Sequence, residues 1–214
     1  MNKAVELITA WGNFDAQHPK NSVEDFCRHY LTHKREKVQE IKLPKGGLMP
    51  PTIDGQLMRL LGRIMKLHSI YTVSATEGTG INSIEEFSLL NIVHELKEPR
   101  KSEAISTSLF ELSTGTDMLN RLKKMGFITE YNDKEDKRAK RLKITAKGEK
   151  VLAACRKNIG RLAAMMFLDM SEDDKLLCYQ LLKPVEIKFS VARQSHKGKS
   201  FNAVYEEGMS VEKK

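Results

Sequence analysis

Apolar residues recur every three or four positions along most of the chain, and this spacing is typical of amphipathic helices that bury one face. The clearest run extends from Ile53 to Tyr71 in steps of four and three. It predicts a long helix whose apolar stripe suits packing against a partner chain. A second run, from Leu152 to Met166, has close to the spacing of a heptad seam. The pattern therefore predicts a mainly helical protein.

The first fifty residues predict two helices and a linker. The apolar stripe of the first helix, over residues 2–17, consists of Ala4, Leu7, Ile8, Trp11 and Phe14. The second helix starts at the capping box Ser22-Val-Glu-Asp25 and carries apolar residues as far as Val38. The segment from Leu43 to Pro51 is rich in glycine and proline and is interpreted as a linker. We therefore expect residues 1–51 to be an N-terminal extension, too short for a large core of its own.

The middle of the chain predicts two helices before a third that is central to function. Ser83-Ile-Glu-Glu86 is a capping box, and the helix that it opens stops before Pro99. A short helix from Ser102 to about Phe110 follows, with apolar residues spaced for burial. We expect these two helices to lie within a lobe of about residues 82–148.

The third helix is expected over residues 114–125. Ser113-Thr-Gly makes a tight break, and Thr114-Gly-Thr-Asp117 again fits a capping box. Gly126 is placed to close this helix as a C-cap residue. A short helix, a tight turn and a second helix make a helix-turn-helix unit.

After Gly126 the period of the pattern changes from that of a helix to that of strands. Residues 127–131 are rich in β-branched and aromatic side chains, residues 132–139 are polar, and residues 140–145 alternate charged and aliphatic side chains. This predicts a β-hairpin directly after the third helix. The fold class is therefore mainly α with a small β-hairpin wing: a winged helix-turn-helix plus a helical dimerisation region.

The remainder of the chain is predicted to be helical. Ser171-Glu-Asp-Asp174 caps a last helix, which Pro184 is expected to break or kink, and the chain after about Arg193 is expected to be a mobile tail. The expected parts are an N-terminal extension (1–51), a winged-helix domain with flanking dimerisation helices (52–192, DNA-binding lobe about 82–148) and a polar tail (193–214).

Charge and composition narrow the function. The formal net charge is +8, and between Lys97 and Lys150 there are 14 Lys or Arg against 9 Asp or Glu. A basic chain suggests a nucleic acid or an anionic surface as partner, although this signal alone is weak. The N-terminus lacks the pattern of a signal peptide, and no eighteen apolar residues run together. We therefore expect a cytoplasmic protein without a membrane partner.

The outer face of the predicted third helix has the side chains that read DNA. Asn120 and Arg121 are of the types that make paired hydrogen bonds to adenine and guanine edges in the major groove. Ser113, Thr114 and the backbone amides at the helix start suit phosphate contacts. A solvated helix face is the alternative interpretation of a polar stripe, and the following hairpin favours DNA.

The predicted hairpin turn is strongly basic. A charge run is often only a wet surface, but this one lies at the tip of a hairpin after a candidate recognition helix. Asp136, two residues before Arg138, would repel phosphate and is expected to hold an arginine in place. The residues expected at DNA are Ser113, Thr114, Thr116, Asp117, Asn120, Arg121, Lys124, Lys137, Arg138, Lys140 and Arg141.

The wing segment resembles that of the MarR family of transcriptional regulators. In that family an Asp-x-Arg element precedes a Leu-Thr-x-x-Gly junction, and here Asp136-Lys-Arg138 precedes Ile144-Thr-Ala-Lys-Gly148. Leu119 to Ile128 resembles the end of the family's recognition helix, Ile84 to Leu90 resembles an earlier helix, and the resemblance covers about residues 52–190. The first fifty residues depart from the family pattern.

The resemblance implies a homodimer with intertwined terminal helices and one winged domain per subunit. It also implies that Arg138 enters the minor groove, that Asp136 orients basic side chains, and that the operator is a pseudo-palindrome. A bound small-molecule effector or an oxidation would change the spacing of the lobes. His68 and Tyr71 are candidates for lining an effector cleft, with an ordinary core or dimer contact as the alternative.

No catalytic constellation stands out, so we expect neither an enzyme nor a cofactor. The three cysteines are too few and too scattered for a disulfide framework or a zinc site, and Cys27 and Cys155 lie on predicted apolar stripes, where cysteine is usually buried. His29 and His33 are four residues apart on a helix, but no HExxH pattern accompanies them and no metal is expected.

The sequence thus predicts a dimeric, sequence-specific regulator that binds double-stranded DNA. The alternative is a winged-helix protein-interaction module that does not read DNA. The polar face of the third helix and the Asp136/Arg138 wing discriminate between the two, because an interaction module would need neither.

Overall fold

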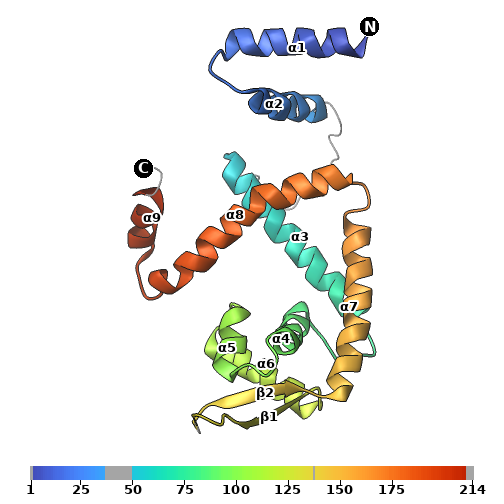
Figure 1. Cartoon of the computed structure of the whole chain (residues 1–214), viewed down its shortest axis with the longest axis vertical. Coiled ribbons are helices and arrows are strands. Elements are labelled where there is room, and N and C mark those ends of the chain that lie inside the picture. The colour runs from blue at the N-terminus through green and yellow to red at the C-terminus, as the bar shows by residue number, and fades with distance from the viewer. Residues whose placement is uncertain (1, 37–49, 137, 211–214) are drawn as a thin grey trace. The chain divides into compact units, whose positions relative to one another are not determined.

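The structure is a computed structural model that describes residues 2–36, 50–136 and 138–210 (Figure 1). It divides into two compact units, residues 1–56 and residues 57–214. None of the described helices is long and apolar enough to cross a membrane.

The first unit contains a helical pair held by aromatic side chains. Helix α1 (Lys3–Gln17) and helix α2 (Val23–Glu36) contact each other. The predicted capping box is confirmed, because Ser22 Oγ accepts from the Asp25 backbone and the Asp25 carboxylate accepts from the Ser22 backbone. Phe14 and Phe26 are buried, with ring centroids 5.5 Å apart.

Fewer side chains are buried in this unit than the apolar stripes of the sequence predict. Leu7 and Ile8 are exposed, and so is Cys27, which was expected on a buried face. Two helices alone have only one contact seam, so the side chains away from Phe14 and Phe26 remain in solvent. Val38 and most of the predicted linker lie outside the described residues.

The second unit contains the remaining elements. They are α3 (Ile53–Ala75), which begins in the last residues of the first unit, α4 (Ile84–Glu95), α5 (Lys101–Thr107), α6 (Leu112–Lys124), β1 (Ile128–Asn132), β2 (Lys140–Ile144), α7 (Ala146–Met166), α8 (Glu172–His196) and α9 (Phe201–Ser210). Helices α4, α5 and α6 pack together and against the hairpin (Figure 1). This is the predicted order of a winged helix-turn-helix.

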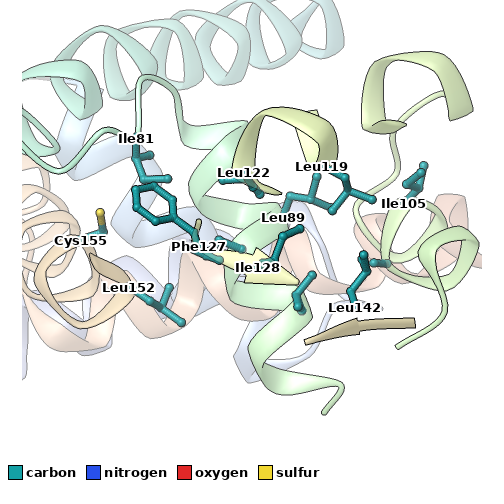
Figure 2. Packing of buried hydrophobic residues seen from close by; sticks show 13 residues of the cluster. Ile81, Leu89, Ile105, Leu119, Leu122, Phe127, Ile128, Leu142, Leu152 and Cys155 are labelled. Atoms are coloured by element: carbon teal, nitrogen blue, oxygen red, sulfur yellow. The ribbon is translucent and has the colours of Figure 1, made fainter. Parts of the chain in front are cut away.

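The core of the second unit lies inside this winged lobe. Leucines of α4 and α6 meet apolar residues of the hairpin and of α7, and Figure 2 shows these side chains directed toward one another. The side chains that are at most 2 % exposed include Leu89, Leu119, Leu122, Phe127, Ile128, Leu142 and Leu152. The lobe therefore buries its own apolar faces without help from another chain.

The change of period at Gly126 marks the start of the wing. Gly126 has φ 74°, a left-handed conformation that suits glycine after a helix. Strands β1 and β2 then pair antiparallel, with Ile128 opposite Ile144 and Asn132 opposite Lys140. Both predicted strands are confirmed to within a residue.

Helix α6 begins earlier than the sequence pattern predicts. Its N-cap position is Glu111, and the Gly115 N–H already donates to the Glu111 carbonyl. The predicted break at Ser113 and capping box at Thr114 are therefore wrong. The turn lies just before Leu112 and includes Leu109 at φ 59°. The glycine that suggested a break has a packing role, since a Cβ there would lie 2.6 Å from Ile105 Cγ2.

The C-terminal part is more regular than predicted. Helix α8 continues through Pro184, so the proline does not break it. The expected polar tail contains α9, on which Phe201 and Tyr205 lie one helical turn apart with ring centroids 6.1 Å apart. The sequence does carry this signal, because Phe201, Tyr205 and Met209 have a spacing of four.

Candidate nucleic-acid interface

The outer face of α6 presents a row of exposed polar side chains. Gly115, Leu119 and Leu122 are buried on the inner face of this amphipathic helix. The opposite side carries Ser113, Thr114, Asp117, Asn120 and Lys124, all exposed, and the half-buried Thr116. Within the described residues, none of these six takes part in an ion pair. They are therefore available to an external partner.

Arg121 is placed differently from the prediction. Its Nε lies 2.6 Å from Glu86 Oε1, and its Nη2 donates to the Gly80 carbonyl at 3.2 Å. Glu86 is only 8 % exposed and also accepts from the Asn82 backbone. The expected position of Arg121 on the DNA-reading face is therefore corrected. Its long side chain reaches back from the edge of α6 and ties the helix to the turn before α4.

Arg138 is exposed at the end of the hairpin turn, where the sequence predicts a contact with DNA. Its backbone N–H donates to Asp136 Oδ1 at 3.0 Å. Ala139 N–H donates to the Asp136 carbonyl at 2.8 Å. Asp136 therefore shapes the backbone of the turn. The expectation that its carboxylate holds an arginine side chain is corrected, since its described hydrogen bonds go to the backbone.

Asp133, which the sequence interpretation passed over, is the carboxylate that holds arginines. Its side chain is 1 % exposed, with Oδ2 2.5 Å from Arg141 Nε and 3.4 Å from Arg100 Nε. Its Oδ1 accepts from the backbone of Asp136 at 3.0 Å and of Glu135 at 2.9 Å. These backbone donors, together with Arg141, hold the pKa of the Asp133 carboxyl well below its usual range.

Several cations of the wing are already paired within the lobe. Lys140 bonds to Asn132 across the hairpin, and Lys143 Nζ lies 2.7 Å from Glu98 Oε1. Hydrogen bonding to Asp133 raises the pKa of Arg141 above its ordinary value. The predicted contact residue Lys137 lies outside the described residues. The charge run of the sequence is thus partly internal, which leaves Arg138 as the prominent exposed arginine of the described wing.

The junction after β2 is a structural motif. Thr145 Oγ1 donates to the Gly126 carbonyl at 2.7 Å and accepts from the Gly148 backbone at 3.0 Å. A Cβ on Gly148 would lie 2.1 Å from the Phe127 carbonyl oxygen. The Thr-x-x-Gly pattern therefore fixes the start of α7 against the start of the wing.

Tyr71 borders a cavity of about 500 Å³ that is broadly open to solvent, and His68 is not among its lining residues. The cavity lies between α3 and α7, where Asn158 Nδ2 donates to the Ala75 carbonyl at 3.0 Å. Arg161 and Met165 line it from α7. Of the two effector-cleft candidates, Tyr71 lines this cavity, and an effector there stays a prediction.

Other chemistry is sparse in the described part of the chain. His29 and His33 lie with ring centroids 3.9 Å apart, but among residues 2–36, 50–136 and 138–210 no three His, Cys, Asp or Glu side chains are arranged to hold a metal ion. Cys155 is buried as expected, and burial raises the pKa of its thiol. A buried thiol of this kind is a poor nucleophile.

Comparison with known protein families agrees with this geometry. Residues 83–148 match the family model described as a winged helix DNA-binding domain. No protein among the curated sequences matches the chain significantly. The family match spans the region from the N-cap of α4 to the Thr-x-x-Gly junction, and it includes α6 and the wing.

Solved structures extend the likeness beyond this domain. A crystal structure of MarR is 21 % identical with a TM-score of 0.61, covering 70 % of this chain and 99 % of that chain. A cysteine-to-serine mutant of MarR from E. coli, complexed with operator DNA, is 21 % identical with a TM-score of 0.59, covering 65 % and 99 %. The transcriptional repressor CouR bound to a 23-mer DNA duplex is 18 % identical with a TM-score of 0.59, covering 66 % and 99 %.

Residues 83–148 are therefore a winged helix DNA-binding domain. The fold of about 70 % of the chain is similar to that of MarR.

Proposed function

We propose that this protein is a dimeric, sequence-specific DNA-binding regulator of transcription. The observation that carries the proposal is the pairing of an exposed polar face on α6 with an exposed Arg138 on the wing that follows it. A helix of this size fits the major groove, and a wing arginine suits the narrow, electronegative minor groove. The two DNA-bound structures with this fold support the same use of the lobe.

The identities of the exposed side chains suggest how bases are read. Asn120 can donate to and accept from an adenine edge, and Asp117 can accept from the amino group of cytosine. Ser113, Thr114 and Lys124 suit phosphate oxygens beside the groove. Because Arg121 is occupied by Glu86, we propose that guanine reading by this arginine is not part of the recognition.

Dimerisation is proposed from the apolar faces of the long helices. The predicted stripe of α3 is largely in solvent, and α8 also exposes large apolar side chains. The exposed members include Leu57, Leu60 and Leu67 on α3 and Leu181, Val185 and Phe189 on α8. Exposed apolar side chains in such number support an interaction site on these helices. A symmetric dimer would place two lobes on half-sites about one helical turn apart, on a pseudo-palindromic operator.

A small-molecule effector is proposed for the cavity beside Tyr71. The phenol ring and the Arg161 side chain border the same space, so an aromatic acid is the ligand class that suits it. Binding there would act between α3 and α7, which the hydrogen bond from Asn158 to the Ala75 carbonyl joins beside the cavity.

The central test begins with selection of bound duplexes from a random library by the full-length protein, followed by affinity measurements on the selected site. Arg138→Ala and Asn120→Ala should each weaken binding by about 1–3 kcal/mol, and Asn120→Ala should also relax the preference for one base. Affinity should fall steeply with salt, because bound cations leave the phosphates. Unchanged affinity in both variants would contradict the proposal.

The second candidate is a protein-interaction module that keeps the winged fold. The exposed apolar faces of α3 and α8 are the observation that favours it. The two candidates separate in the same experiment, because an interaction module selects no common sequence from the library and shows no loss when Asn120 is replaced.

A further inference from the structure

Asp133 lies where β1 passes into the hairpin turn, and both of its oxygens are used. Oδ1 accepts from the backbone N–H groups of Glu135 at 2.9 Å and Asp136 at 3.0 Å, so it fixes the path of the turn. Oδ2 bridges the guanidinium groups of Arg141 and Arg100. The side chain is 1 % exposed. One carboxylate therefore joins the turn, the second strand of the wing and the residues before α5.

The segment 97–100, between α4 and α5, is the second half of this connection. Lys97 and Glu98 adopt φ of 49° and 65°, which non-glycine residues adopt only when neighbouring contacts hold them. Arg100 forms a β-bridge with Arg141, and the Leu142 N–H donates to the Pro99 carbonyl at 2.9 Å. The segment is therefore joined to β2 by one isolated bridge and one backbone hydrogen bond.

Glu98 adds contacts to both strands of the wing. Its carboxylate accepts from Tyr131 of β1 at 2.5 Å and lies 2.7 Å from Lys143 of β2. Its backbone carbonyl accepts from Arg141 Nη1 at 2.9 Å. The Arg141 guanidinium is thus held at two ends, by Asp133 and by Glu98. The wing is attached to the helical lobe at several points.

The charge of Asp133 argues for a geometric role. A carboxylate beside a DNA-binding wing lowers the positive potential that attracts phosphate, so on electrostatics alone its removal would strengthen DNA binding. It also keeps Arg141 and Arg100 turned into the lobe. Any favourable contribution of Asp133 to DNA binding must therefore come from the position in which this residue holds the wing.

We propose that Asp133 is a positioning residue that, through Arg100, Arg141 and the segment 97–100, sets the direction in which the wing presents Arg138 to DNA. The proposal rests on the proposed function, since it names the residue on which presentation of the wing depends. Asp136, the acid that the family resemblance implies for this role, instead shapes the local turn.

The test compares Asp133→Asn with Asp136→Asn in the full-length protein. Both variants remove one negative charge from the same turn, so any purely electrostatic effect is matched. Affinity is measured for the duplex selected by the wild-type protein and for a scrambled duplex. Asp133→Asn should lose roughly tenfold or more for the selected duplex, as expected for lost hydrogen bonds to a charged group. Asp136→Asn should lose clearly less. Equal or tighter binding of the selected duplex by Asp133→Asn would overturn the proposal.

A second measurement does not depend on DNA binding. Amide hydrogen exchange of the wing is followed by mass spectrometry in the free protein, with the segment around α4 as internal reference. In Asp133→Asn the amides of the turn should exchange about tenfold faster or more, because Glu135 and Asp136 lose a charged acceptor. Exchange that is unchanged in the turn would overturn the proposal. If the wild-type protein selects no duplex, the proposed function fails, and the exchange result still reports on the wing.

A third variant separates charge from geometry. Arg141→Lys keeps the positive charge but cannot reach both Asp133 and the Glu98 carbonyl with a planar fork. It should therefore resemble Asp133→Asn in DNA affinity, whereas the turn amides keep the Asp133 carboxylate as acceptor and should exchange as in the wild type. Wild-type affinity for the selected duplex in Arg141→Lys would contradict the proposed connection.

Discussion

The winged lobe and the long helices of the second unit use apolar residues in opposite ways. In the lobe, Leu89, Leu119 and Leu122 are at most 2 % exposed, and the charged groups around them are paired. On α3, Leu60 and Leu67 have the same helical spacing but are 53 % and 45 % exposed. The lobe buries its apolar residues within one chain, whereas the apolar stripe of α3 remains largely exposed.

This difference suggests that the residues that stabilise the fold are distinct from those proposed for association and for DNA binding. Mutations in the lobe core should act on folding of a single chain. Mutations on the α3 stripe should weaken association of two chains, and mutations on the outer face of α6 should change the affinity for DNA. The following changes test that separation, from the largest expected effect to the smallest.

Gly148→Ala should have the largest effect. The new methyl group would overlap the Phe127 carbonyl, which is backbone and cannot move aside cheaply. We expect the free energy of unfolding to fall by about 3 kcal/mol or more, measured by chemical denaturation. Gly160→Ala is the matched control in the same helix, because a Cβ there meets nothing within 4 Å. It should be neutral or stabilising by about 0.5–1 kcal/mol. Equal losses in both variants would contradict this account of the junction.

Leu60→Glu should break the proposed dimer and leave the lobe folded. Two symmetric copies would each bring a charge into the apolar contact, so the dissociation constant should rise about a hundredfold, or about 3 kcal/mol. Analytical ultracentrifugation measures this directly. Lys66→Glu introduces the same side chain on another side of α3 and should leave association nearly unchanged. A Leu60→Glu dimer as tight as the wild type would place the interface elsewhere.

Arg121→Ala should lower the free energy of unfolding, because this arginine holds α6 in place. It removes the partner of Glu86, a nearly buried carboxylate, and the expected cost is about 1–3 kcal/mol. Lys124→Ala, on the exposed face of the same helix, should change stability by no more than about 0.5 kcal/mol. If the two variants unfold at the same denaturant concentration, Arg121 does not hold the helix.

The smallest expected effect is on the dependence of the free energy of unfolding on pH in the acidic range. The pKa values of Asp133 and Glu98 are lowered in the folded protein, the first mainly by backbone N–H donors and the second mainly by Lys143. A carboxyl group whose pKa is lowered on folding stabilises the protein at pH values above its unfolded pKa of about 4. That stabilisation is lost as the pH falls through the pKa of the folded state. Unfolding free energy should therefore decline from about pH 5 downward through these groups. The decline should be shallower in Asp133→Asn, and an identical profile would show that Asp133 does not contribute.

The sequence was sufficient for the elements whose signals are local. The change from helical to alternating spacing after Gly126 predicted β1 and β2, and the caps at Ser22, Ser83 and Ser171 hold in the structure. The start of α6 was misplaced because a glycine in the sequence looks the same whether it bends the chain or lets two helices approach. Its packing on Ile105 depends on the fold.

The side-chain roles within the site could be predicted only in part. Asn120 and Arg138 are exposed as expected, because helix periodicity and a hairpin tip determine exposure locally. Arg121 depends on Glu86, which is distant along the chain, and Asp133 depends on Arg100. Neither partnership leaves a periodic signal. Of two acids in one turn, the sequence motif pointed to Asp136, and only the burial of Asp133 distinguishes them.

The placement of Arg121 has a consequence for retargeting. The residues of α6 that anchor the helix are distinct from those that face outward. The anchoring residues are Gly115, Leu119, Arg121 and Leu122, and the outward residues are Thr116, Asp117, Asn120 and Lys124. The outward set can be exchanged as a block while the anchoring set is kept. A library confined to those four outward positions is therefore a rational starting point for variants with new operator preferences.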